Sequence, residues 1–125
     1  MSSVIELTPN DFATNNPQKL SKNFIGKVTI VKFYSPQCGH CITSQPEYEK
    51  LANTLKNDTK YIVAQLNCEV NYELINSLNK FSNGYVVDGY PTHIIFLDSL
   101  FFQNYTGKRD MNSILNHLTN INTFT

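Results

Sequence analysis

Apolar residues in this chain follow two patterns, short continuous runs and helical spacing. The run at 28–34 is rich in β-branched and aromatic residues, which is typical of a buried strand. Elsewhere apolar residues recur every three or four positions, as they do on one face of a helix. In chain order the sequence predicts a strand at 4–7, a helix at 11–20 that Thr8 or Asn10 can cap, a strand at 28–34, a helix at 38–56, a strand at 61–66, a helix from 72 that stops near 82–84, strands at 92–97 and 100–105, and a last helix that includes 111–118.

This order of elements, βαβαβαββα, predicts an α/β fold. A strand, helix, strand unit needs a crossover connection and makes the strands parallel, whereas the closing hairpin adds antiparallel strands. We therefore expect a mixed central sheet with helices on both faces. A chain of 125 residues without repeats or linkers fits a single domain over 1–125.

Charge and hydropathy exclude several classes of partner. Ten basic and ten acidic residues cancel, and no run approaches the roughly 20 apolar residues of a membrane helix. We expect no nucleic acid or membrane partner, and a monomer. The first residues lack the features of a secretory signal, so we expect a domain that works in the cytoplasm or packaged in a particle, or in the endoplasmic reticulum lumen if a signal was removed.

The candidate chemistry lies at Cys38-Gly39-His40-Cys41, where a helix is predicted to begin. A dithiol that cycles through a disulfide holds its sulfurs about 2 Å apart when oxidised and keeps one thiolate when reduced. The partial positive charge of the helix N-terminus favours a Cys38 thiolate, so Cys38 is the predicted nucleophile and Cys41 the resolving thiol. Gly39 keeps the turn open to an approaching protein. A positive charge on His40 favours the thiolate over the disulfide and makes the pair more oxidising.

A Cys-x-x-Cys pair is also half of a typical zinc site. Tetrahedral zinc needs four ligands, and Cys68, His93 and His117 form no second close pair in the sequence. We therefore expect no metal and no other cofactor. Cys68 is predicted to be a small buried residue, with an auxiliary redox thiol as the alternative.

The segment 31–41, Val-Lys-Phe-Tyr-Ser-Pro-Gln-Cys-Gly-His-Cys, and the segment 46–51 that follows it closely resemble a catalytic domain of protein disulfide isomerase, within the thioredoxin superfamily. The resemblance extends to 4–8, 89–92 and 105–109. It implies a thioredoxin fold and a disulfide isomerase or oxidase that acts on protein dithiols and disulfides. It also implies an upstream thiol oxidase or reductase as a redox partner.

The resemblance assigns further roles outside the cysteine motif. Pro91 matches the family's cis-proline, so substrate is expected to lie between Tyr90 and Cys38. Arg109 matches an arginine that lowers the pKa of the resolving cysteine in disulfide isomerases. An ordinary surface charge is the alternative for Arg109.

Three positions depart from the family pattern. Gln37 replaces the usual Trp, which reduces the apolar surface offered to clients. Lys32 stands where the family has a buried acid, and Gln65 where it has the lysine that pairs with that acid. We expect Lys32 to support the Cys41 thiolate or to accept its proton, and the alternative is that Lys32 extends to solvent.

Two other functions stay open at this point. The first is a cytosolic thioredoxin-like disulfide reductase, because the cytosol keeps protein thiols reduced. The second is a redox-inert thioredoxin-fold module that binds a peptide or protein, with the changes at Lys32, Gln37 and Gln65 reflecting lost catalysis. A reduction potential below about −250 mV for the Cys38–Cys41 pair favours the reductase.

Overall fold

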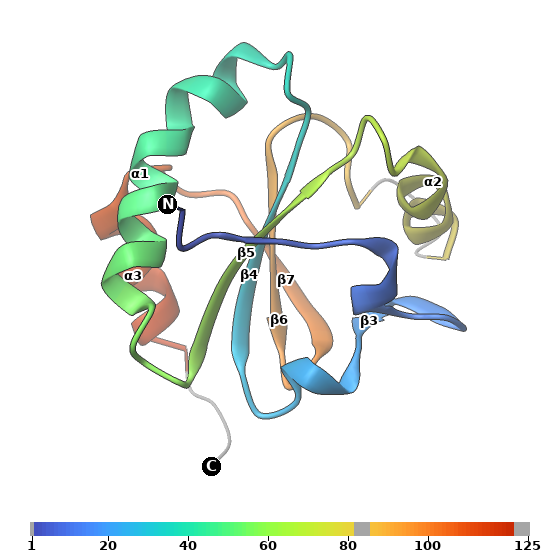
Figure 1. The fold of residues 1–125 in the computed structure, drawn as a ribbon, viewed down its shortest axis with the longest axis horizontal. Coiled ribbons are helices and arrows are strands. Elements are labelled where there is room, and N and C mark those ends of the chain that lie inside the picture. Colours follow the sequence, from blue (N-terminus) through green and yellow to red (C-terminus); the bar gives the residue numbers. More distant parts are fainter. Residues whose placement is uncertain (1, 82–85, 122–125) are drawn as a thin grey trace.

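The computed structural model describes residues 2–81 and 86–121, and in these ranges three α-helices pack on one mixed sheet (Figure 1). In chain order the strands are β1 (Ile5–Glu6), β2 (Phe12–Ala13), β3 (Asn16–Leu20), β4 (Val28–Tyr34), β5 (Tyr61–Asn67), β6 (Thr92–Leu97) and β7 (Leu100–Tyr105). The helices are α1 (Gly39–Leu55), α2 (Tyr72–Phe81) and α3 (Met111–Thr119), and two short 3₁₀ helices cover Pro9–Asp11 and Lys22–Phe24. None of the helices in the described ranges is long and apolar enough to cross a bilayer.

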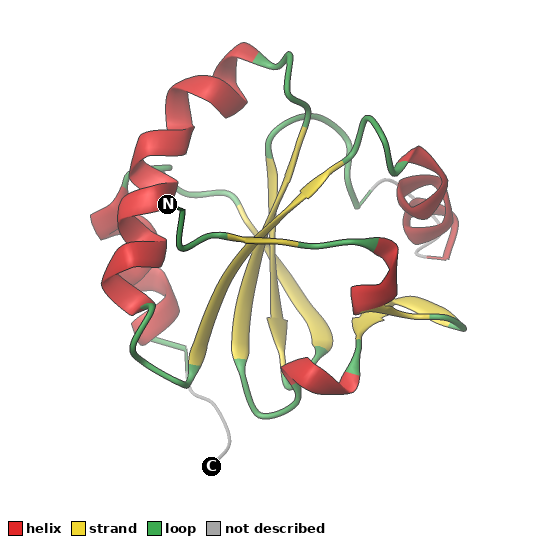
Figure 2. Ribbon diagram, in the orientation of Figure 1, coloured by secondary structure: helices red, strands yellow, loops and turns green. Residues whose placement is uncertain are grey.

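The sheet combines parallel and antiparallel pairs in the order β1-β5-β4-β6-β7-β3-β2. β1 and β4 each run parallel to β5, and the remaining neighbours are antiparallel. Helices α1 and α3 cover one face, whereas α2 and the β2–β3 hairpin lie on the other side (Figures 1 and 2). The predicted mixed sheet with helices on both faces is confirmed.

Two apolar clusters form the core, one on each face of the sheet. Alternate residues of a strand point to opposite faces, so Val28 and Ile30 of β4 pack under α1 and α3, while Val31 and Phe33 pack under α2. This alternation determines which side chains of β4 lie beneath the cysteine-bearing helix.

The predicted helix at 11–20 is wrong, because this segment forms the β2–β3 hairpin with a turn between Ala13 and Asn16. Pro17 explains the difference in physical terms. A proline lacks the backbone N–H that a helix interior needs, and it disfavours helical geometry at the residue before it. Thr8 does act as an N-cap, but the element that it caps is the short 3₁₀ helix Pro9–Asp11.

The remaining predicted elements are close to those observed. β4, β6 and β7 have the predicted bounds, and α1 begins one residue later than predicted, with Cys38 as its N-cap. The stop predicted for α2 at 82–84 lies outside the described residues.

Candidate active site

Cys38 lies where β4 gives way to α1, at one end of the sheet. Pro36 follows the strand, the Cys38 N–H donates to the Ser35 carbonyl at 3.1 Å, and the Ile42 N–H donates to the Cys38 carbonyl at 3.1 Å, which begins the helix. The Cys38 Sγ accepts a hydrogen bond from the Cys41 N–H at 3.2 Å. The sulfur therefore occupies the position that a capping oxygen takes at a helix N-terminus.

The two sulfurs of the motif have opposite electrostatic environments. Burial raises the pKa of Cys38, but hydrogen bonds from Cys41 and His40 and the nearby charge of Lys32 outweigh it, and the net pKa is lowered. Cys41 is 3% exposed, and burial followed by its hydrogen bond to Cys38 raises its pKa to about 11. Cys38 thus has the properties of an attacking thiolate, and Cys41 those of a protected resolving thiol.

The loop before β6 brings a backbone carbonyl to Cys38. The Tyr90–Pro91 peptide is cis, as the resemblance implies, and the Cys38 thiol donates to the Tyr90 carbonyl at 3.3 Å. The Tyr90 side chain is 40% exposed, so this part of the loop lies at the surface beside the reactive sulfur.

The two residues between the cysteines are exposed. The His40 ring faces solvent, while its backbone N–H helps to lower the Cys38 pKa. A Cβ added at Gly39 would meet no atom of the described chain within 4 Å, so the fold leaves open space there.

Lys32 lies fully buried beneath the start of α1, with 0% exposure. Its Nζ donates to the Cys41 carbonyl at 2.9 Å, to Ser44 Oγ at 3.1 Å and to Gln45 Oε1 at 2.8 Å. The alternative that Lys32 extends to solvent is therefore wrong, because its ammonium finds all three partners inside. Burial lowers the pKa of Lys32, and the charges of Cys41 and Cys38 oppose that shift.

Gln45 links Lys32 to carboxylates at the surface. Its Nε2 donates to Glu49 Oε2 at 2.8 Å and to Gln65 Oε1 at 3.0 Å, and the Gln65 Nε2 donates to Glu6 Oε1 at 2.9 Å. We call Lys32, Gln45, Gln65, Glu49 and Glu6 the polar chain. It reaches from beneath the cysteines to the edge of the sheet.

Strand register explains why polar groups gather here. Five neighbouring strands each contribute one polar residue at the same level on the α1 face. In spatial order these residues are Glu6, Gln65, Lys32, His93 and Tyr105. His93 is 4% exposed and packs against the rings of Tyr48 and Tyr105, and burial, followed by the charges of Lys32 and Arg109, lowers its pKa to about 3.

Arg109 lies exposed on the loop between β7 and α3. It lines a hollow of about 220 Å³ together with Pro91, His93 and Gly107. Its charge lowers the pKa of Lys32 and of His93, but in residues 2–81 and 86–121 no hydrogen bond or ion pair joins it to either cysteine.

Cys68 follows β5 on the opposite face of the sheet and is buried, as predicted. Burial raises its pKa to about 12, and its thiol donates weakly to the Leu66 carbonyl at 3.7 Å. All three cysteines are free thiols in this structure. Burial dominates the environment of Cys68, and the Tyr90 side chain also hydrogen-bonds its sulfur.

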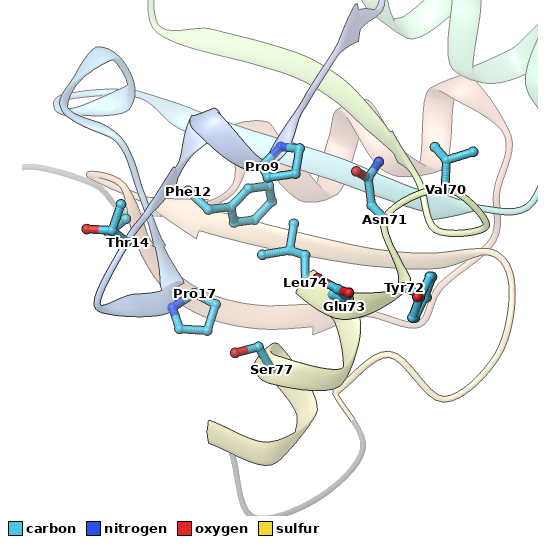
Figure 3. A pocket seen from close by; sticks show the side chains of 11 residues that line it. Pro9, Phe12, Thr14, Pro17, Val70, Asn71, Tyr72, Glu73, Leu74 and Ser77 are labelled. Atoms are coloured by element: carbon cyan, nitrogen blue, oxygen red, sulfur yellow. The ribbon is translucent and has the colours of Figure 1, made fainter.

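No metal site accompanies the cysteines: in the part of the chain that the structure describes, no three His, Cys, Asp or Glu side chains come together as ligands. A larger hollow, of about 570 Å³, lies between the β2–β3 hairpin and the start of α2. Figure 3 shows Phe12 and Pro17 on one side of it and Tyr72 and Leu74 on the other. Neither cysteine of the motif lines this hollow.

Comparison with known proteins now identifies the family. The thioredoxin family model matches residues 4–120. The chain belongs to the thioredoxin family. It is 33% identical over 119 residues to protein disulfide-isomerase 1 of Dictyostelium discoideum and 34% identical over 117 residues to protein disulfide-isomerase A3 of Gallus gallus. Each match covers 94% of this chain, which spans 29% and 20% of the length of these relatives.

The structure of this thioredoxin domain agrees with that assignment. Superposition on the Trx4 domain of ERdj5 gives a TM-score of 0.68 at 21% identity and covers 95% of both chains. The thioredoxin fold predicted from the motifs is confirmed.

Two residues of the thioredoxin domain's site were not predicted from the sequence. Gln45 lies four positions after Cys41 on α1, a spacing that places both on one side of a helix. His93 follows Pro91 by two positions and shares the face of Ile95 in a strand with period two. Both signals are present in the sequence, but neither indicates contact with Lys32.

Proposed function

We propose that this thioredoxin domain is a thiol–disulfide oxidoreductase of the disulfide isomerase or oxidase type, acting on protein cysteines. The observation that supports it most strongly is the position of the Cys38 sulfur, 3.2 Å from the Cys41 N–H that donates to it and 3.3 Å from the Tyr90 carbonyl. A capped, ionisable sulfur beside an open backbone edge is what exchange with an extended protein substrate requires.

Two sulfur exchanges complete one turnover. The Cys38 thiolate attacks a substrate disulfide, and a mixed disulfide forms as one substrate thiolate leaves. Cys41 then loses its proton, its thiolate attacks the Cys38 sulfur, and the second substrate thiolate leaves. Two electrons pass from the domain to the substrate, and the reverse sequence oxidises a substrate dithiol. Isomerisation uses the first exchange and its reversal.

The neighbouring residues support these steps. Lys32 stabilises the thiolates electrostatically, because the charges of Lys32 and both cysteines act on one another. A substrate strand would lie along Tyr90 and Pro91, and the open space at Gly39 leaves room for it. In the proposed function the His40 backbone N–H stabilises the Cys38 thiolate, and Arg109 supplies positive charge for Cys41 during resolution.

Insulin reduction and oxidative refolding of a reduced protein test the proposal directly. Wild type should be active in at least one assay, Cys38→Ser should be inactive in both, and Cys41→Ser should accumulate mixed disulfides because resolution is lost. Absence of cysteine-dependent turnover in both assays contradicts the proposal and favours a redox-inert binding module.

The reduction potential separates an isomerase or oxidase from a cytosolic reductase. We expect a value nearer that of disulfide isomerases, about −180 mV, than that of thioredoxin, about −270 mV. The names of the two relatives support this direction. Titration of the Cys38–Cys41 pair against glutathione gives the potential, and a value below about −250 mV favours the reductase.

A further inference from the structure

Three hydrogen bonds around the Lys32 nitrogen favour its charged form, whereas burial lowers its pKa. An ammonium has three N–H donors, and Lys32 uses them on three acceptors of α1, the Cys41 carbonyl, Ser44 Oγ and Gln45 Oε1. Hydrogen bonds from a charged donor to these oxygens are stronger than those from a neutral amine. The arrangement therefore stabilises the cation.

No carboxylate pairs directly with this cation. Within residues 2–81 and 86–121 the structure contains one ion pair, and it lies at the surface between Lys50 and Glu47. The polar chain compensates the charge of Lys32 indirectly instead. The oxygen of Gln45 faces Lys32, and its nitrogen faces Glu49 and Gln65.

This indirect compensation leaves the field of the cation available to the sulfurs. A carboxylate in contact with Lys32 would cancel most of that field, whereas aligned amide dipoles stabilise the cation and keep the anionic groups at a distance. The titratable and charged groups that act on or contact Lys32 are Cys38 at the N-cap of α1, Cys41, Tyr48 and Glu49 within α1, His93 of β6 and Arg109 before α3. Among them, only the two cysteines change charge with the redox state.

We propose that Gln45 is a positioning residue that keeps Lys32 protonated beneath Cys38 and Cys41, and that the polar chain thereby makes the disulfide a stronger oxidant. The inference rests on the proposed function and adds a control of its potential. When a substrate dithiol reduces the Cys38–Cys41 disulfide, two electrons enter the domain, the substrate disulfide forms, and a Cys38 thiolate, a Cys41 thiol and one released proton result. The new negative charge meets the Lys32 ammonium, so the reduced state is stabilised.

Two substitutions of Gln45 separate this role from simple packing. Gln45→Glu places a carboxylate against Lys32, which raises the Lys32 pKa but cancels its field at the sulfurs. Gln45→Met removes the acceptor, which lowers the Lys32 pKa and favours the neutral amine. Thr43→Glu is the matched control, because it adds the same charge to the exposed side of the same helix turn.

The experiment combines a glutathione equilibrium with an NMR titration of the Lys32 side chain in the reduced protein. We expect both Gln45 variants to lower the equilibrium constant for reduction of the Cys38–Cys41 disulfide about tenfold, which corresponds to about 30 mV. The Lys32 pKa should move in opposite directions in the two variants. Thr43→Glu should change the equilibrium constant less than about threefold, because solvent screens an exposed charge.

Each outcome decides the question. Opposite shifts of the Lys32 pKa with a weaker oxidant in both variants support the proposal. An unchanged equilibrium constant or Lys32 titration in the folded Gln45→Glu protein overturns it, as does an equal effect of Thr43→Glu. A wild-type domain that forms no disulfide with glutathione overturns the proposed function. The NMR titration of Lys32 in the reduced protein then shows separately whether Gln45 controls the charge of Lys32.

Discussion

Lys32 and Phe33 are adjacent on β4, both have 0% exposure, and they face opposite sides of the sheet. Phe33 packs among apolar residues under α2, with the ring of Phe12 at 6.5 Å. Lys32 lies under α1, where its cation is hydrogen-bonded to the helix that carries the cysteines. Both faces of the sheet carry an apolar cluster, but only the face under α1 also carries the polar groups of the site.

Cysteines show the same contrast between the two faces. Cys41 and Cys68 are 3% and 2% exposed, and burial raises the pKa of both. The charge of Lys32 opposes this shift at Cys41, whereas at Cys68 the shift is opposed by hydrogen bonds, the largest from the Tyr90 side chain, and by no nearby cation of the described chain. Burial alone therefore does not decide whether a thiol takes part in exchange; the polar groups that share its face do.

The largest effect on stability is expected from the apolar face. Phe33→Ala should lower the free energy of unfolding by about 3–5 kcal/mol, because it removes a large side chain from a fully packed site. Its glutathione equilibrium constant should stay within about twofold of wild type, because the Phe33 side chain points to the face opposite Lys32 and α1. Urea denaturation measures the first quantity. A tenfold change in the second would show that the faces are coupled.

On the polar face, stability should depend on pH through His93. The pKa of His93 is lowered to about 3 from 6.5, so between these values the unfolded chain binds more protons than the folded one. Stability therefore falls as pH falls through this window, by about 2–3 kcal/mol at pH 4.5 relative to pH 7.5. Urea denaturation of wild type and His93→Leu at both pH values measures it.

The His93→Leu variant should lose this part of the acid sensitivity, while the exposed-histidine variant His40→Gln should keep it. An equal pH dependence in wild type and His93→Leu would mean that His93 titrates normally in the folded protein.

The strands of the core were predictable because burial on both faces produces continuous β-branched and aromatic runs, as in β4 and β6. The hairpin at 12–20 differs from the predicted helix because Thr8 caps only the short 3₁₀ helix Pro9–Asp11, and Pro17 disfavours a helix beyond it. The backbone restriction imposed by Pro17 is the more informative signal in that segment.

The site residues likewise fall into two groups, those that the sequence indicates and those that only the fold brings together. Cys38, Cys41 and Pro91 belong to short contiguous motifs, and the structure brings them together at one end of the sheet. The partners of Lys32 depend instead on register between distant strands and on one turn of α1, and pattern reasoning does not supply either. Residues that interact through tertiary pairing, such as Gln45 and His93, need the fold before their role is visible.

Removing the buried charge should separate stability from redox chemistry. Lys32→Met keeps the aliphatic packing and removes a desolvated cation, but it also takes a donor from the Cys41 carbonyl and from Gln45 Oε1. These effects oppose each other, so the free energy of unfolding at pH 7.5 should change by no more than about 1 kcal/mol. The glutathione equilibrium constant should fall about tenfold, because the thiolates lose their nearby cation. Urea denaturation and glutathione titration measure the two effects.

The pH dependence of Lys32→Met provides a further check. The folded pKa of Lys32 lies below 10.5, so the unfolded chain binds more protons in the window beneath that value, and wild type gains stability as pH rises through it. Lys32→Met should lack this gain, and the exposed-lysine variant Lys50→Met should retain it. A potential unchanged in Lys32→Met would remove Lys32 from the mechanism.

The smallest effect is expected at Cys68. Cys68→Ala should cost about 1 kcal/mol of stability, because it removes one buried sulfur and leaves a small cavity. Turnover and the glutathione equilibrium constant should match wild type, and iodoacetamide at pH 8 should alkylate native Cys38 while leaving Cys68 unmodified, since burial raises the Cys68 pKa to about 12. Mass spectrometry of the labelled peptides measures this directly. Loss of turnover in a folded Cys68→Ala protein would instead make Cys68 an auxiliary redox thiol and end the functional separation of the two faces.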